Sequence, residues 1–241
     1  MKILVVENYP NSPLGNVGEA LAERDVQLDT VIAHGGQPIP DGPNGYDGLI
    51  MLGGAQSALD DDDYPFLPAL ARLTRAFGDS GRAVLGICLG SQIIARAYNG
   101  GNVLDRPLEF GYRPVFPLPE AAEDPVLSVL TGPSPTFHWH KDTVTLPPGA
   151  VRLAESEMTA NQAWRIGNNV YASQFHFEAS AAVVGDWSVQ ARDHILEHAP
   201  EWPDMLPLAL EKNAGPADRL GLELGRRWVT LAQELRGNRR D

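Results

Sequence analysis

The feature that most constrains the fold is a Gly-x-Cys-x-Gly segment that joins an apolar run to a helical pattern. Residues 83–88 read AVLGIC, and residues 90–99 continue as GSQIIARAYN. A strand, then Gly86-x-Cys88-x-Gly90, then a helix is the layout of a nucleophile elbow, a turn so tight that its central residue takes an unusual backbone conformation. Side chains at the two glycines would collide with neighbouring backbone. We therefore expect the thiol of Cys88 at the carboxyl end of a sheet, where open α/β sheets bind ligands.

The rest of the first half alternates between short apolar runs and helical patterns. No two-residue hairpin signal separates them, which favours a parallel sheet built from βαβ units. The predicted strands are residues 2–8, 26–34, 46–54 and 83–88, and the predicted helices are residues 16–25, 64–81 and 90–99.

From about Gly111 the pattern becomes strand-like, with an IGNNVY turn at residues 166–171 that predicts a hairpin and a partly antiparallel extension of the sheet. The chain then reads as helical at residues 180–199 and 216–237, with a linker at 200–216. We expect an α/β fold: one catalytic domain at residues 1–199, whose central, mostly parallel sheet is flanked by helices, and a C-terminal helical extension at residues 200–241.

The last predicted helix carries an apolar stripe at helical spacing, Leu220, Leu224, Trp228 and Leu231. We expect this stripe to cover the domain's own core. The alternative is an exposed face for a partner or a second copy of the chain.

Charge and cysteine content exclude several classes of protein. The net charge of −12 argues against binding to nucleic-acid phosphates, which needs clustered lysine and arginine. No apolar run is long enough to span a membrane, and the opening MKILVVENYPN does not read as a secretion signal. With one cysteine, no internal disulfide can form, and we expect a cytoplasmic protein whose thiol stays reduced.

Cys88 has two interpretations, a small buried hydrophobe or a nucleophile. The elbow places it at a helix N-terminus, whose dipole favours thiolate over thiol, and aims the backbone N–H of Leu89 at the same point. A catalytic cysteine also needs a base, and the base needs an orienting group.

Of the six histidines, His176 fits the role of base best. In QFHFE the spacing His-x-Glu puts His176 and Glu178 on one side of an extended segment, so the carboxylate can hold one ring nitrogen while the other faces Cys88. His138 and His140 alternate on a predicted strand and line a pocket or form a polar strand face. His34 reads as a solvated loop residue.

His194 and His198 have a spacing that could share a metal ion, but Ile195 stands where a zincin motif needs glutamate. We therefore expect no metal at that pair.

These motifs resemble the class I glutamine amidotransferase family, whose members use a Cys–His–Glu triad, and in particular the glutaminase part of GMP synthase. The resemblance spans residues 45–180 and includes MLGGAQS, GICLGSQ, FHWHKDTVTLP and ASQFHFE in family order. It implies a flavodoxin-like sheet, a free-standing amidotransferase domain and no cofactor.

Site residues follow from the same resemblance. It implies that Cys88 is the nucleophile, His176 the general base and acid, and Glu178 the orienting group. The oxyanion hole would come from the N–H groups of Leu89 and Gly54. Gln92 and the segment around His140 match positions that hold the substrate.

Two positions depart from the family pattern. Ala55 follows Gly53-Gly54 where the family often has proline, and Phe177 stands where His-Pro-Glu is usual. The cysteine, histidine and glutamate of the triad remain, and the two departures indicate a divergent subgroup of the family.

The activity implied is hydrolysis of glutamine or a γ-glutamyl compound through a cysteinyl thioester, with ammonia or an amine released. Glutamine or a γ-glutamyl compound is the expected small-molecule partner, and a synthetase subunit or a second copy of the chain is the protein partner that the resemblance allows. Two alternatives stay open: a hydrolase of the DJ-1/PfpI type, which usually has histidine where this chain has Leu89, and a non-catalytic binding or redox-sensing subunit that retains the fold.

Overall fold

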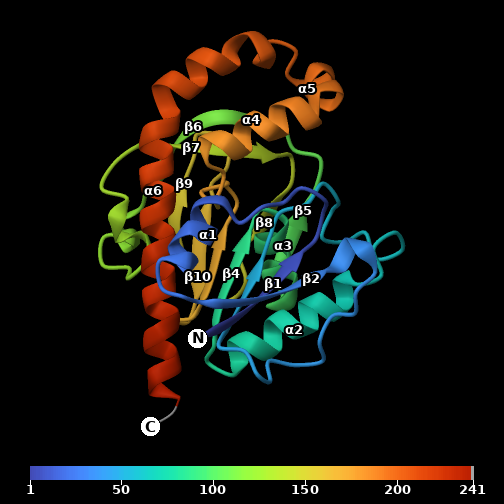
Figure 1. Cartoon of the computed structure of the whole chain (residues 1–241), viewed down its shortest axis with the longest axis vertical. Coiled ribbons are helices and arrows are strands. Elements are labelled where there is room, and N and C mark those ends of the chain that lie inside the picture. The colour runs from blue at the N-terminus through green and yellow to red at the C-terminus, as the bar shows by residue number, and fades with distance from the viewer. Residues whose placement is uncertain (240–241) are drawn as a thin grey trace.

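The computed structural model describes residues 1–239, and a nine-stranded sheet runs through its centre (Figure 1). The strand order is β2-β1-β3-β4-β11-β10-β9-β6-β7. The bounds are β1 Lys2–Glu7, β2 Gln27–Ile32, β3 Gly48–Met51, β4 Ala83–Ile87, β6 Glu109–Pro117, β7 Ser134–His140, β9 Ala150–Glu155, β10 Ala163–Ile166 and β11 Val170–Ser173. A separate antiparallel pair joins β5 Gly101–Val103 to β8 Thr143–Thr145.

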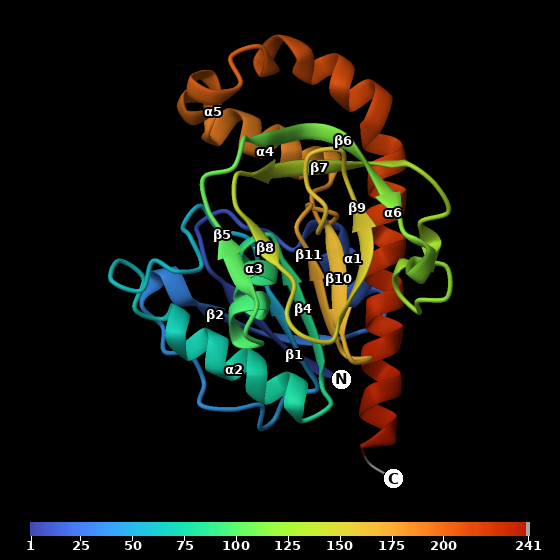
Figure 2. The same cartoon turned by 180° about the vertical axis from the view of Figure 1, so that it is seen from behind.

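Helices cover both faces of this sheet. Their bounds are α1 Gly15–Ala22, α2 Leu67–Asp79, α3 Leu89–Ala97, α4 Ala181–Gln190, α5 Arg192–His198 and α6 Trp202–Asn238, with short 3₁₀ turns at Ala33–Gly35, Pro119–Ala121 and Leu127–Val129. α1 and α6 lie over one face, and α2 and α3 over the other (Figure 2).

The parallel half of the sheet confirms the predicted α/β fold. β2, β1, β3, β4 and β11 pair in parallel. In β1, Ile3 and Val5 belong to the core cluster under α1 and α6, whereas Leu4 and Val6 belong to the cluster under α2 and α3. Burial on both faces is why this strand is a continuous apolar run rather than an alternating one.

The second half of the sheet is antiparallel, as predicted. β10 and β11 form the hairpin around Gly167, whose φ of 57° suits a glycine. β11 then pairs in parallel with β4, so the last strand of the chain lies in the middle of the sheet.

The predicted linker at residues 200–216 is wrong, because residues 202–216 form the first part of α6, which continues to Asn238 through Pro207 and Pro216. Figure 1 shows α6 arching across one end of the molecule and then running straight along the sheet. Trp202, Leu206 and Leu210 are four residues apart and pack on one aromatic cluster. This packing outweighs the missing N–H groups of the prolines, which bend the helix without ending it.

The single helix predicted at residues 180–199 is in fact two, because the chain leaves helical geometry at Ala191 (φ −103°, ψ 25°) between α4 and α5.

The terminal apolar stripe covers the protein's own core, as predicted. Leu224 is 2% exposed and Trp228 is fully buried, and both belong to the cluster that contains β1 and α1 residues. The domain boundary at residue 199 stays a prediction, and the last two residues of the predicted extension, 240 and 241, lie outside the described residues.

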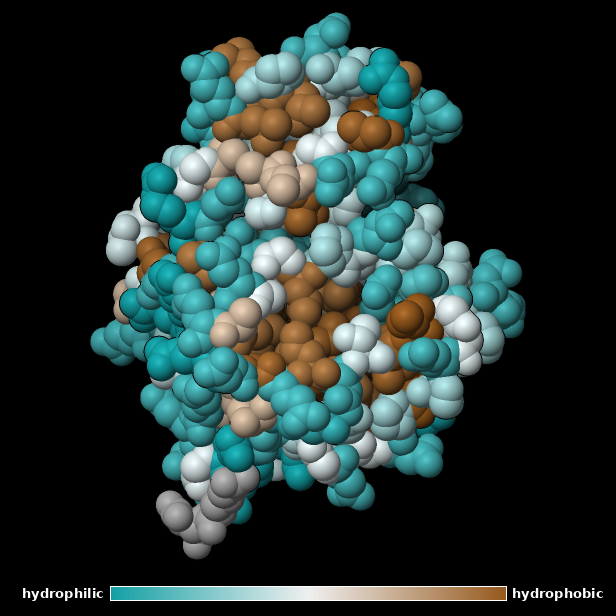
Figure 3. Space-filling model, viewed as in Figure 1, coloured by the Kyte–Doolittle hydropathy of each residue, from teal (hydrophilic) through white to brown (hydrophobic). Residues whose placement is uncertain are grey.

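The arch of α6 exposes apolar side chains, including Met205 and Leu208, each 53% exposed. Figure 3 shows brown side chains gathered at that end of the molecule. None of the helices within residues 1–239 is both long and apolar enough to cross a membrane.

Candidate active site

Cys88 stands at the turn between β4 and α3 in the strained conformation that the sequence predicts, with φ 51° and ψ −108°. A Cβ at position 86 would lie 2.4 Å from the carbonyl oxygen of Gly90, and one at position 90 would lie 2.3 Å from that of Met51. Both glycines are therefore required by close backbone approach. The turn holds the thiol at the carboxyl end of β4 and at the N-terminus of α3.

His176 and Glu178 are paired in the segment that follows β11. The His176 Nδ1 atom lies 2.6 Å from Glu178 Oε1, and the residues are 7% and 2% exposed. The backbone N–H of His176 donates to the carbonyl oxygen of Phe137 at 2.8 Å, which fixes the segment against β7.

The structure brings His176 close to Cys88 as well as to Glu178. Burial alone would lower the pKa of His176, but the charges of Glu178 and Cys88 and hydrogen bonds to both residues raise it to about 10. The ring therefore carries a proton at neutral pH. A buried imidazolium beside a sulfur can deliver that proton to a leaving group.

The Gly53-Gly54 turn after β3 closes the other side of the thiol. A Cβ at position 53 would lie 3.1 Å from Cε1 of His176 and 3.6 Å from Cβ of Cys88. A Cβ at position 54 would lie 2.7 Å from Cδ2 of Leu89. The two predicted oxyanion residues, Gly54 and Leu89, thus lie side by side next to Cys88.

Gln174 is a site residue that the sequence analysis missed. Its Nε2 atom donates to the Sγ atom of Cys88 at 3.6 Å and its Oε1 atom accepts from Gln92 at 3.2 Å. The sequence did contain a signal for Gln174. It lies two residues before His176, and this spacing puts both side chains on one side of an extended segment. Gln92 is 3% exposed and borders a cavity that opens over Cys88.

A cavity of about 1110 Å³ opens over Cys88 and His176. Its walls come from four segments: the loop at residues 9–13, the turn at 52–57, residues 139–142, and residues 187–194 of α4 and α5. The Trp187 ring stands edge-on to the ring of His176, with centroids 5.2 Å apart. The cavity therefore has one reactive wall and one aromatic wall.

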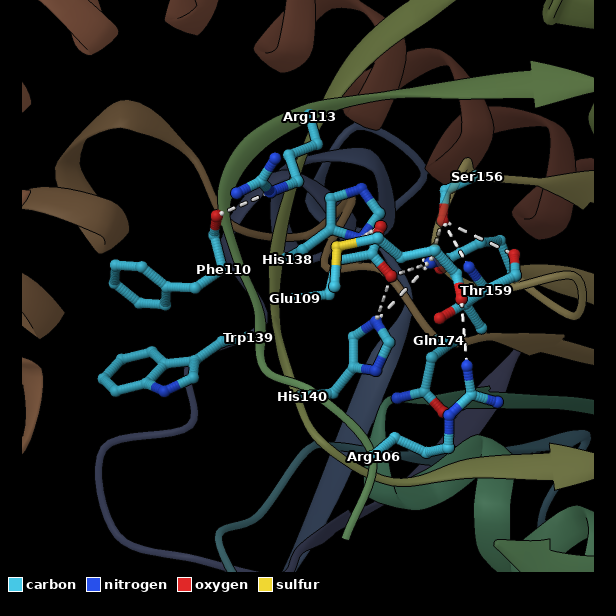
Figure 4. Close-up of polar contacts among 12 residues, drawn as sticks. Arg106, Glu109, Phe110, Arg113, His138, Trp139, His140, Ser156, Thr159 and Gln174 are labelled. Carbon is cyan, nitrogen blue, oxygen red and sulfur yellow. Dashed lines mark hydrogen bonds and ion pairs between the residues drawn. The ribbon is translucent and has the colours of Figure 1, made fainter. Parts of the chain in front are cut away.

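His138 and His140 face the same side of β7, as predicted, but their nitrogens are directed mainly into the protein. His140 lines the cavity, yet its Nδ1 lies 3.1 Å from the carbonyl oxygen of Asp142 and its Nε2 lies 3.3 Å from Oε2 of Glu109. Nδ1 of His138 lies 3.6 Å from Oε1 of Glu109. Figure 4 shows Glu109 and the two histidines converging on one another.

Burial and contacts set the charge states of this buried group. Burial would raise the pKa of Glu109, but the hydrogen bond to His140 and the positive charge of His138 lower it to about 2. Burial lowers the pKa of His138 to about 3.

Of the remaining histidines, His194 lines the outer part of the cavity and His34 lies away from it. His194, Glu197 and His198 form an exposed group at α5 whose ligand atoms lie within 4.8 Å of one another. His34 is half-buried in a 3₁₀ turn, 3.3 Å from Glu7, and is not the solvated loop residue expected.

Comparison with known proteins identifies a family. The family model described as "Glutamine amidotransferase class-I" matches residues 4–187. Among curated relatives, a glutamine-hydrolyzing GMP synthase subunit of Methanosarcina acetivorans is 35% identical over 77% of this chain and 92% of its own length. The putative glutamine amidotransferase-like protein YfeJ of Salmonella typhimurium is 29% identical over 70% of this chain and 68% of its own.

One further relative and one solved structure are similar to this chain. The gamma-glutamyl peptidase 5 of Arabidopsis thaliana is 30% identical over 58% of this chain and 56% of its own length. The crystal structure of a glutamine amidotransferase from Methylobacillus flagellatus superposes with a TM-score of 0.85 at 26% identity, covering 95% of this chain and 94% of that one.

Proposed function

This chain belongs to the class I glutamine amidotransferase family, and we propose that it hydrolyses the γ-amide bond of glutamine or of a γ-glutamyl compound through a thioester on Cys88. The observation that carries the proposal is the strained backbone of Cys88 next to His176, whose Nδ1 atom lies 2.6 Å from Oε1 of Glu178. This arrangement combines a nucleophile, an acid and an orienting group, the three parts of a covalent hydrolase.

In the first half of the reaction, the Cys88 thiolate attacks the γ-carbonyl carbon and the carbonyl oxygen becomes an oxyanion. The backbone N–H groups of Leu89 and Gly54 donate to it, and each such donor contributes about 3 kcal/mol to transition-state binding. His176 then gives its proton to the nitrogen as the C–N bond breaks. Ammonia or an amine departs, and the γ-glutamyl group remains on sulfur as a thioester.

In the second half, water hydrolyses the thioester. His176, now neutral, takes a proton from the attacking water, and Glu178 stabilises the imidazolium that forms. The C–S bond breaks, glutamate leaves, and the thiolate and imidazolium are restored. Glu178 keeps Nδ1 as the donor, so that Nε2 is the nitrogen that exchanges protons with the substrate.

The size of the cavity favours a γ-glutamyl compound with a substantial leaving amine. At about 1110 Å³ it exceeds the range that drug-sized ligands usually occupy. We place the glutamyl part against Gln92 and the face of His140 that lines the cavity, and the leaving amine against Trp187. The similarity to a gamma-glutamyl peptidase supports this assignment.

Ammonia delivery to a synthetase is the other use of the same chemistry. It is supported by the similarity to the Methanosarcina GMP synthase protein, whose name marks it as one component of a glutamine-hydrolysing enzyme. On either route we place the reaction in the cytoplasm, where the Cys88 thiol stays reduced.

Glutamate release tests the proposal. The purified protein and its Cys88→Ala variant are incubated with glutamine and with γ-glutamyl amides and peptides of increasing leaving-group size. Turnover that depends on Cys88 supports the hydrolase, and faster turnover of the larger compounds selects the peptidase-type substrate over ammonia supply.

A protein without turnover is tested with a thiol-reactive glutamine analogue. Because Cys88 is the only cysteine, any thiol label reports on that residue alone. Labelling that glutamine competes away supports a subunit that needs its synthetase partner. The absence of both turnover and labelling in folded protein contradicts the proposal and favours a non-catalytic or redox-sensing role.

A further inference from the structure

We propose that Glu109, His138 and His140, together with Gln162, bind a divalent transition-metal ion behind the thiol, with Zn²⁺ as the ion that this ligand set suits best. Two imidazoles and a carboxylate are ligands that Zn²⁺ accepts in proteins. The three residues are 1%, 0% and 6% exposed, and one ligand atom from each lies within 4.8 Å of the others. The sequence analysis expected no metal, because these residues come together only in the folded sheet.

The fold places these ligands on two paired strands. Glu109 on β6 stands opposite His140 on β7, and His138 is two residues away on the same side of β7. Gln162 comes from the segment that leads into β10. The site is therefore built on the rigid antiparallel part of the sheet rather than on loops.

The distances between the candidate ligand atoms are near the edge lengths of a zinc tetrahedron, and Glu109 presents a different oxygen to each histidine. Zn–N and Zn–O bonds of about 2.0–2.1 Å require tetrahedral ligand atoms about 3.3–3.4 Å apart. Glu109 Oε2 lies 3.3 Å from His140 Nε2, and Glu109 Oε1 lies 3.6 Å from His138 Nδ1. The amide nitrogen of Gln162 lies 3.4 Å from each of those two ring nitrogens.

The outer hydrogen bonds turn the remaining ring nitrogens toward the centre. The carbonyl oxygen of Asp142 can only accept, so Nδ1 of His140 donates to it, and Nε2 is the ring nitrogen that faces Glu109. Nε2 of His138 lies 2.9 Å from the hydroxyl of Thr136, which leaves Nδ1 for the centre. A hydrogen bond on the far nitrogen is the usual way in which a metal-binding histidine is oriented.

Gln162 supplies a second, independent observation. It is fully buried, and its Oε1 atom has no hydrogen-bond partner among the described residues. Its Nε2 atom donates to Glu109 at 3.0 Å and to the hydroxyl of Ser156 at 3.1 Å. A half-turn of the amide exchanges the two atoms and brings the unpartnered oxygen among the other three ligands as a fourth.

An ion at this position would also brace the candidate active site. Trp139 lies between the two histidines on β7, and its carbonyl oxygen is 3.9 Å from the Sγ atom of Cys88. Phe137, one residue earlier than His138, holds the backbone of His176. The effect on turnover rests on the proposed function, whereas metal binding does not.

Metal analysis and cobalt spectroscopy test the inference. The whole protein is stripped with a chelator and titrated with Zn²⁺ by calorimetry, and Co²⁺ is added separately to record its visible spectrum. We expect one Zn²⁺ per chain and the intense visible bands of tetrahedral Co²⁺. The near-isosteric Glu109→Gln variant should bind at least 10-fold more weakly, with a circular dichroism spectrum like that of the parent.

Two controls separate this site from other ligands. The His194→Ala/His198→Ala double variant removes the exposed histidine pair on α5, and Cys88→Ala removes the thiol; both should retain one Zn²⁺. The Cys88→Ala protein cannot turn over on the proposed mechanism, so its metal binding is independent of the proposed function. The inference is overturned if the parent binds no Zn²⁺, or if binding survives Glu109→Gln and disappears in either control.

Discussion

The Nδ1 atom of His176 lies 2.6 Å from the Oε1 atom of Glu178, with one residue between them in the chain. Because the contact is buried, the pair affects both the reaction and the stability of the folded chain. The pKa of His176 rises from 6.5 to about 10, so folding favours the protonated ring. The stabilisation is complete below pH 6.5 and is lost as the pH rises through about 10.

Glu178→Gln should therefore lower kcat by about 10²–10⁴-fold, because the general acid loses its orienting charge. It should also be less stable than the parent by an amount that is largest near pH 6 and shrinks toward pH 10. Denaturant unfolding at several pH values measures this difference. A difference that stays constant or grows toward pH 10 would contradict the assignment of His176 as the protonated partner.

Glycine at position 86 should contribute strongly to the stability of the folded chain. The Cβ of Gly86→Ala would lie 2.4 Å from backbone oxygen, and such overpacking costs about 1–3 kcal/mol or more. Gly185→Ala is the matched control, because no described residue outside the adjacent turns of α4 lies within 4 Å of the added Cβ, and helix α4 should gain about 0.5–1 kcal/mol. Urea unfolding measures the change in the free energy of unfolding for both variants. Equal changes would argue against the close approach of β4 and α3.

The straight part of α6 should contribute strongly to stability. Leu224→Ala removes a side chain that is 2% exposed and should cost about 2–5 kcal/mol. Leu208→Ala makes the same change on the arch of the same helix, where the side chain is 53% exposed, and should stay within about 0.5 kcal/mol. A large loss at Leu208 instead would indicate that the arch is covered in solution.

Trp187 should select the leaving amine. Trp187→Leu should lower kcat/KM for γ-glutamyl compounds with aromatic amines by about 10-fold relative to glutamine, because contacts in an apolar pocket contribute roughly 1–3 kcal/mol. Taking the ratio cancels any general effect on the neighbouring His176. Val189→Ala, at a cavity position that is 75% exposed, is the control and should leave the ratio unchanged. An unchanged ratio in Trp187→Leu would show that the leaving amine contacts a different wall of the cavity.

The local parts of this site could be predicted from the sequence, and the long-range parts could not. Gly86, Cys88 and Gly90 lie within five residues, so their steric requirements can be read from the chain itself. The network of Glu109, His138 and Gln162 joins β6, β7 and the segment before β10, and no local pattern predicts that these three meet.

The first part of α6 shows a different limit. Pro207 and Pro216 lack the backbone N–H that a helix needs, and residues 200–216 were accordingly predicted to form a linker rather than a helix. Packing of Trp202, Leu206 and Leu210 on an aromatic cluster decides the outcome, and this packing depends on β6 and β7, which lie roughly 60–100 residues earlier in the chain.

The central position of β11 has a consequence for how the protein is made. β4 gains its second neighbour only when residues 170–173 pair with it, and His176 and Glu178 follow immediately. A ribosome that adds about 5–20 residues each second has therefore synthesised roughly 90 residues beyond Cys88 before the thiol can meet its partners. Throughout that interval the nascent chain carries an unpaired sheet edge and an incomplete site. Synthesis order itself thus keeps the proposed reaction silent until the sheet is closed.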